Sequence, residues 1–123
     1  MTWTYHQSTG DLFHDGVFIG TGYSGAGTTR AEGRNNGDMQ GVSNEGPIPR
    51  GMWTIGRQRT DPKMGSIAMP LTPVSSSTAL GRSGFFIHGN NQANNASEGC
   101  VILANGIRSA ISRSTDKSFE VVA

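Results

Sequence analysis

The chain has 123 residues, which is enough for one domain with a single hydrophobic core and too few for two. Hydrophobic residues make up 34% and charged residues 15%, and 18 positions are glycine, a polar and turn-rich composition that favours many short strands over a helical bundle. The net charge of +1 gives no electrostatic basis for binding nucleic acid or an anionic membrane surface, and we expect neither partner. These values predict a single all-β domain over residues 1–123.

The N-terminal part predicts a meander of three short strands. Apolar and polar residues alternate over 2–7, and a second short strand is expected over 11–14. Asp15 and Gly16 predict a tight hairpin turn, because this dipeptide tolerates positive φ, and 17–23 returns as the third strand.

A long surface loop is expected over 24–44, where apolar residues are nearly absent. Loops of this length in a compact domain tend to be functional or mobile, so this one is a candidate rim for an active site. Tyr23 at its base is a candidate pocket residue, and ordinary core packing explains it equally well. His6 and His14 have no ligand-like spacing to the cysteine or to carboxylates, so we expect no metal and no cofactor.

The central part of the chain predicts further strand structure. Within 45–56, Pro47 and Pro49 exclude helix, and the alternation that follows them places Trp53 in a strand with its side chain in the core. Residues 67–71 allow a short strand inside an otherwise polar, proline-containing segment.

The C-terminal part predicts one helix and one strand. Ile107 and Ile111, four residues apart among polar neighbours, indicate a short amphipathic helix over 104–112, and 119–122 closes the chain as a strand. No charged and apolar leader opens the chain, and no apolar run is long enough to cross a bilayer. We therefore expect a soluble protein with no signal peptide and no membrane insertion.

The stretch that carries chemistry lies between these parts. Residues 85–87 and 101–103 predict two short strands, joined by a polar loop over 89–98. His88 ends the first strand and Cys100 begins the second, so pairing of the strands can bring the imidazole and the thiol together. Cys100 is the only cysteine, which excludes an internal disulfide and leaves the thiol free to react.

A thiol becomes a nucleophile when a base or a depressed pKa favours the thiolate, and His88 is the candidate base. Gly99 lets a substrate carbonyl approach the backbone, so the amides of Gly99 and Cys100 are candidate donors to an oxyanion. Ser97 is placed to hold the turn. A lone cysteine is most often a small buried apolar residue, and a lone histidine is most often a polar residue with its hydrogen bonds satisfied. Packing does not require the two residues at facing strand ends with a glycine beside each. Their combination therefore favours a catalytic pair.

The pattern His-Gly, a loop, then Ser-x-Gly-Cys and aliphatic residues resembles the signature of the L,D-transpeptidase catalytic domain, a family of cysteine enzymes that act on the peptide stems of bacterial peptidoglycan. It is most similar to the compact branch, which includes effectors of type VI secretion. The resemblance implies an L,D-transpeptidase-like β-sandwich or barrel with one short C-terminal helix. It also implies that Cys100 is the nucleophile, that His88 is the base and that the Gly89 carbonyl orients the imidazole, with the Gly99 and Cys100 amides at the oxyanion site. Larger members usually carry arginine two residues after the cysteine, where this chain has Ile102, so anchoring of substrate by that arginine is not inferred.

Three more residues are candidate substrate contacts, namely Tyr23, Arg82 and Asn90. Arg82 is included because a guanidinium suits a peptide carboxylate and because it lies close in sequence to the strand that ends at His88. A position in a surface turn explains Arg82 as well.

The resemblance implies a cysteine-dependent enzyme that acts on tetrapeptide stems through a thioester. It would be an L,D-carboxypeptidase, a D-amino acid exchange enzyme or an L,D-transpeptidase, depending on the acyl acceptor. Expected partners are the peptide stems, an immunity protein and a specialised secretion machinery that delivers the protein to the bacterial cell wall in the periplasm. Two alternatives stay open: a non-catalytic wall-binding β-domain, and a papain-like cysteine endopeptidase of the wall, although that class places its cysteine before its histidine and on a helix N-terminus.

Overall fold

Ten short strands and one α-helix form most of the structure, and the computed structural model describes every residue from 1 to 123. The strands are β1 (Trp3–His6), β2 (Asp11–His14), β3 (Val17–Thr21), β4 (Tyr23–Ser24), β5 (Gly51–Ile55), β6 (Arg59–Asp61), β7 (Gly65–Pro73), β8 (Phe86–His88), β9 (Val101–Ile102) and β10 (Ser118–Val122). The helix is α1 (Asn105–Arg113), and short 3-10 helices cover Arg30–Glu32, Gly37–Met39 and Ser76–Ala79. No helix has the length and apolarity that crossing a lipid bilayer requires.

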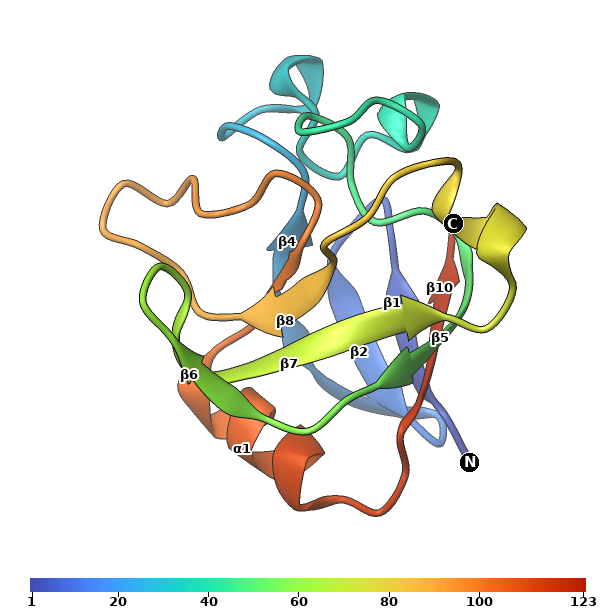
Figure 1. Cartoon of the computed structure of the whole chain (residues 1–123), viewed down its shortest axis with the longest axis vertical. Coiled ribbons are helices and arrows are strands. Elements are labelled where there is room, and N and C mark those ends of the chain that lie inside the picture. Colours follow the sequence, from blue (N-terminus) through green and yellow to red (C-terminus); the bar gives the residue numbers. More distant parts are fainter.

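The strands form one strongly curved sheet in the order β3-β2-β1-β10-β5-β7-β8-β9-β4, with β6 paired to β7 outside this path (Figure 1). Two of the pairs, β1 with β10 and β8 with β9, are parallel, and the others are antiparallel. β3 and β4 stand at opposite ends of the order, yet Gly22 alone separates them along the chain. The sheet therefore curls into a nearly closed barrel.

Large apolar side chains fill the inside of this barrel. Every second residue of β1, β5 and β10 is buried, as expected because side chains alternate between the two faces of a strand. Trp53, Tyr5 and Phe119 are among the largest fully buried side chains, and the Phe85 ring packs edge-on against Trp53 at a centroid distance of 4.9 Å. α1 packs against β7 and contributes the buried Ile111 to the same core (Figure 1).

The structure confirms the all-β class, the short C-terminal helix, the hairpin turn at Asp15 and the core position of Trp53. The segment 24–44 has no strand after β4 and is loop apart from two of the 3-10 helices. The prediction for 67–71 is too short, because β7 extends over nine residues and pairs with β5, β6 and β8 along its length. The predicted third strand is too long, since β3 ends at Thr21 and the chain then crosses to the other end of the sheet.

Candidate active site

His88 is the last residue of β8, and Cys100 directly precedes β9, the parallel neighbour of β8. β8 pairs with β9 so that Ile87 stands opposite Val101 and His88 stands opposite Ile102. Ile87 and Val101 are buried in the hydrophobic core. Because side chains alternate along a strand, His88 and Cys100 project from the other face, and both line one cavity.

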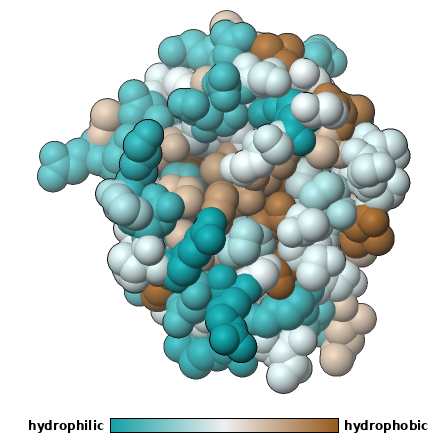
Figure 2. Space-filling model, viewed as in Figure 1, coloured by the Kyte–Doolittle hydropathy of each residue, from teal (hydrophilic) through white to brown (hydrophobic).

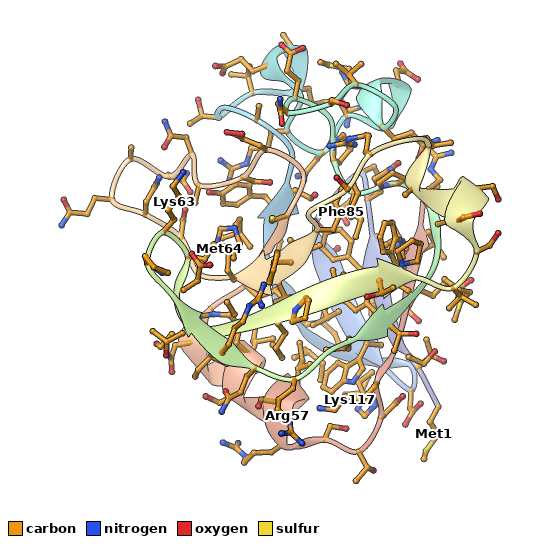
Figure 3. All side chains as sticks on the ribbon, in the orientation of Figure 1. Met1, Arg57, Lys63, Met64, Phe85 and Lys117 are labelled. Carbon is orange, nitrogen blue, oxygen red and sulfur yellow. The ribbon has the colours of Figure 1, made fainter.

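This cavity, called the central cavity below, has a volume of about 590 Å³. Its walls come from the end of the 24–44 loop, the turn between β6 and β7, the turn before β8 and both ends of the loop between β8 and β9. The lining residues are 43–44, 63–65, 81–85, 88–91, 96 and 98–100. Lys63 and Met64 lie on one side of it and Phe85 on the other (Figure 3). Figure 2 shows the same face with a central hollow, apolar atoms at its floor and hydrophilic side chains along much of its rim.

The His88 imidazole is held by its own neighbour in the chain. Its Nδ1 lies 2.9 Å from the carbonyl oxygen of Gly89, which is the hydrogen bond that the sequence resemblance implies. A carbonyl can only accept, so in the neutral ring Nδ1 carries the proton and Nε2 keeps its lone pair. Burial lowers the pKa of His88 below its usual value, the bond to Gly89 opposes this, and the charge of Arg108 adds to the lowering. At neutral pH the ring is therefore an uncharged base.

The surroundings of Cys100 favour the protonated thiol. Its Sγ lies 3.7 Å from the carbonyl oxygen of Gly84, and no hydrogen bond connects it to His88. Burial raises the pKa of the thiol to about 11, although a backbone hydrogen bond from Phe86 lowers it in part. The resting pair is thus a neutral thiol and a neutral imidazole rather than a thiolate and an imidazolium.

Ser97 organises the turn that leads into Cys100. Its buried Oγ accepts the amides of Gly25 and Gly99, each at 3.0 Å, and donates to the Cys100 carbonyl at 2.6 Å. The Gly99 amide is therefore already paired within the protein, which differs from the oxyanion role expected from the sequence. The backbone N–H of Cys100 donates to no loop carbonyl and to no side chain. It is therefore the backbone donor beside the thiol that can bind a substrate oxygen.

Arg82 holds the other side of this turn. Its guanidinium donates to four backbone carbonyls, those of Gln40 at 2.6 Å, Pro47 at 2.8 Å, Gly46 at 3.0 Å and Glu98 at 3.2 Å. Gly99 has a φ of +139°, and a Cβ at this position would lie 2.5 Å from Nη2 of Arg82, so glycine is required there. Arg82 is 8% exposed and binds the protein's own backbone, which differs from the expectation that it meets a substrate carboxylate.

Tyr23 and Asn90 anchor the loop between β8 and β9. The Tyr23 hydroxyl donates to Oδ1 of Asn90 at 2.6 Å and accepts the amide of Ala96 at 2.8 Å. The Arg34 guanidinium stacks on the Tyr23 ring, 3.5 Å from its centroid, and donates to the Asn94 carbonyl at 3.0 Å. Tyr23 is buried and does not line the central cavity, whereas Asn90 does.

Arg108 was not anticipated from the sequence. This arginine of α1 is 8% exposed and donates to the carbonyls of Leu103 at 2.9 Å and Ser66 at 2.6 Å. Its guanidinium packs against Gly89, where a Cβ would lie 2.7 Å from Nη2. Arg108 thus holds the loop after β8 against the start of β7. Its spacing of three residues from Ile111, on the buried face of the helix, is the local signal that predicts its burial.

One cluster outside the central cavity has donor atoms close enough together for a metal ion, namely those of His14, Asp15 and Asp116, all within 4.8 Å of one another. The His14 ring stacks on Trp3 with the ring centroids 3.8 Å apart, and its Nε2 lies 2.8 Å from Oδ2 of Asp116. The two carboxylates also accept backbone amides. These contacts tie β2 to the segment before β10.

The fold and the central cavity define an all-β domain in which a histidine at the end of one strand and a cysteine just before its parallel neighbour line one cavity. The chain belongs to the Tlde1 domain family, whose sequence model matches residues 19–122. This is a family of type VI secretion effectors, in agreement with the effector role expected from the sequence. A comparison with curated proteins finds no match. The relationship to L,D-transpeptidases stays a prediction from the motif.

Proposed function

We propose that the protein is a cysteine-dependent enzyme that modifies the tetrapeptide stems of bacterial peptidoglycan. One observation carries the proposal: an imidazole whose Nδ1 is bound to the Gly89 carbonyl, and whose Nε2 is free, lines the same cavity as the only thiol of the protein. Membership of an effector family supports a target in the cell wall. The motif resemblance supplies the substrate class.

Catalysis begins from the neutral pair. Rotation about the Cα–Cβ bond of Cys100 releases the thiol from the Gly84 carbonyl and turns it toward His88. Nε2 of His88 accepts the thiol proton while the sulfur attacks the carbonyl carbon of the third stem residue, forming a carbon–sulfur bond. The Cys100 amide stabilises the negative charge that develops on the carbonyl oxygen.

The tetrahedral intermediate then collapses. The carbon–nitrogen bond to the terminal D-amino acid breaks, the imidazolium returns its proton to the leaving amine, and a thioester on Cys100 remains. A lowered pKa suits His88 to this step, because a weakly basic imidazole releases its proton readily. Attack by water then gives an L,D-carboxypeptidase, and attack by a free D-amino acid gives an exchange enzyme.

We favour these two outcomes over formation of new cross-links. Trimming or capping the stems removes the donors on which cross-linking depends, which is the effect expected of an antibacterial effector. A papain-like arrangement is disfavoured, because Cys100 directly precedes strand β9 and no helix begins at it. The other candidate is a wall-binding domain without activity.

The test compares the wild type with Cys100→Ala on purified disaccharide-tetrapeptide, with and without added D-amino acids, followed by mass spectrometry. Loss of one terminal residue by the wild type alone establishes hydrolysis, and replacement of that residue establishes exchange. Circular dichroism of both proteins shows whether the alanine variant is folded. Unchanged substrate mass in every condition would favour the wall-binding domain.

A further inference from the structure

Lys63 lies at the tip of the hairpin between β6 and β7, on the rim of the central cavity (Figure 3). The Asp61 carboxylate accepts the backbone amides of Lys63 at 2.8 Å and Met64 at 3.1 Å, which fixes the backbone of this turn. The ammonium group of Lys63 itself makes no hydrogen bond and no ion pair within the protein. A rigid turn therefore presents an unpaired positive charge at the mouth of the cavity.

The charges of the central cavity are few. Lys63, Arg82 and Glu98 are its only lining residues with charged side chains at neutral pH. The Arg82 guanidinium already donates to four backbone carbonyls and is 8% exposed, so it has little capacity for a ligand. Glu98 is exposed and negative, and it repels anions. Lys63 is therefore the one cation of the cavity that is free to bind an anion.

We propose that Lys63 binds a carboxylate of the substrate peptide and so sets a preference for acyl donors that carry one. This inference rests on the proposed function. A lysine suits the task, because its compact charge sits on a flexible stem that adjusts to the position of the anion, and a partly enclosed cavity screens the attraction less than open solvent does. Met64 lines the cavity beside Lys63 and offers an apolar contact to the aliphatic part of the same substrate residue.

The geometry places this contact across the site. Lys63 and Met64 face the cavity from the hairpin, and the turn that ends at Phe85 forms the opposite side (Figure 3). Cys100 and His88 line the same space, so a peptide bound over the thiol extends toward the hairpin in one direction. A tetrapeptide stem has a terminal carboxylate and side-chain carboxylates, and the experiment separates these sources.

The experiment measures kcat/KM of the wild type, Lys63→Met and Lys63→Arg on three forms of one tetrapeptide: the free acid, the C-terminal amide and the side-chain amide. Lys63→Met should lower kcat/KM on the free acid by about tenfold, whereas Lys63→Arg should retain most of it. The difference between the wild type and Lys63→Met should vanish on one of the two amides, which identifies the carboxylate. The control is Arg57→Met, which removes the same charge from an exposed position away from the cavity (Figure 3) and should leave kcat/KM unchanged.

Equal kcat/KM for the wild type and Lys63→Met on all three peptides would overturn the inference and leave the proposed function standing. If the wild type processes no peptide, calorimetry on Cys100→Ala with and without Lys63→Met gives the answer. If adding Lys63→Met to Cys100→Ala weakens binding of the free acid but not of the amide, the inference is supported even though catalysis is refuted. Binding that is equal in both proteins, or absent from both, rejects it.

Discussion

The Ser97 hydroxyl donates a hydrogen bond to the Cys100 carbonyl at 2.6 Å, and the same oxygen accepts the amides of Gly25 and Gly99. One side chain thus connects the segment after β4, the turn before the thiol and the backbone of the nucleophile itself. Ser97 is 2% exposed, so water does not replace these bonds when one is lost. The position of the thiol depends on this oxygen.

Ser97→Ala should therefore lower the free energy of unfolding by about 2–4 kcal/mol, because two amides and one carbonyl lose a partner at a buried site. Urea unfolding followed by circular dichroism measures the change. Ser83→Ala is the matched control, since Ser83 is exposed in the wall of the same cavity, and its effect should stay within about 0.5 kcal/mol. Equal effects of the two substitutions would contradict the role given to Ser97.

Arg82→Met should be among the most destabilising substitutions, at about 3 kcal/mol or more, because it removes the donor to four carbonyls around the turn. Arg82→Lys should cost less, since one ammonium keeps the charge but reaches fewer of these oxygens. The charge of Arg82 also lowers the pKa of the Cys100 thiol, so Arg82→Met should shift thiol alkylation to higher pH. A methionine variant as stable as the wild type would show that the four bonds contribute nothing net.

Alkylation of Cys100 reports the resting state of the thiol. Burial raises its pKa to about 11, so at pH 7 the folded protein should react with iodoacetamide at least about tenfold more slowly than the urea-denatured chain. The rate should rise as the pH increases toward 11. Faster reaction in the folded protein at pH 7 would mean that His88 already holds the thiolate before substrate binds.

His88 makes stability depend on pH at the acid side. Its pKa is lowered in the folded state, so below about pH 6.5 the unfolded chain binds a proton more readily than the folded protein does. The stability that the neutral ring contributes is therefore lost as the pH falls through the folded pKa. From pH 7 to pH 5 the wild type should therefore lose more unfolding free energy than His88→Gln, which has no imidazole to titrate. Urea titrations at several pH values measure this. A difference that is constant with pH would show that the imidazole titrates normally.

The same lowered pKa has a consequence for catalysis. The base stays neutral below the usual pKa of histidine, so kcat/KM on the tetrapeptide should hold its neutral-pH value to below about pH 6.5 and only then decline. A profile of kcat/KM against pH tests this directly. A decline that is already half complete at pH 7 would exclude His88 in this neutral form as the base.

Local patterns predict the parts of this structure that depend on local physics. Alternating burial places Trp53 in the core, and the Asp15-Gly16 pair closes the first hairpin. The sequence predicts only 67–71 of β7 and does not predict β6, because the residues of this hairpin lack a clear alternation. β7 is held instead by pairing with three other strands, which is a tertiary effect.

The sequence by itself determined which reactive groups exist and how they are spaced: a single thiol, a histidine followed by glycine, and the Ser-x-Gly-Cys turn. Only the tertiary structure decided that the two strands run parallel, that the Gly99 amide is already paired, and which guanidiniums support the site. Arg82 meets the Gln40 carbonyl and Arg108 meets the Ser66 carbonyl, each across 42 residues of chain. No local pattern encodes which distant carbonyl a buried guanidinium will find, because that depends on how the whole sheet curls around the core.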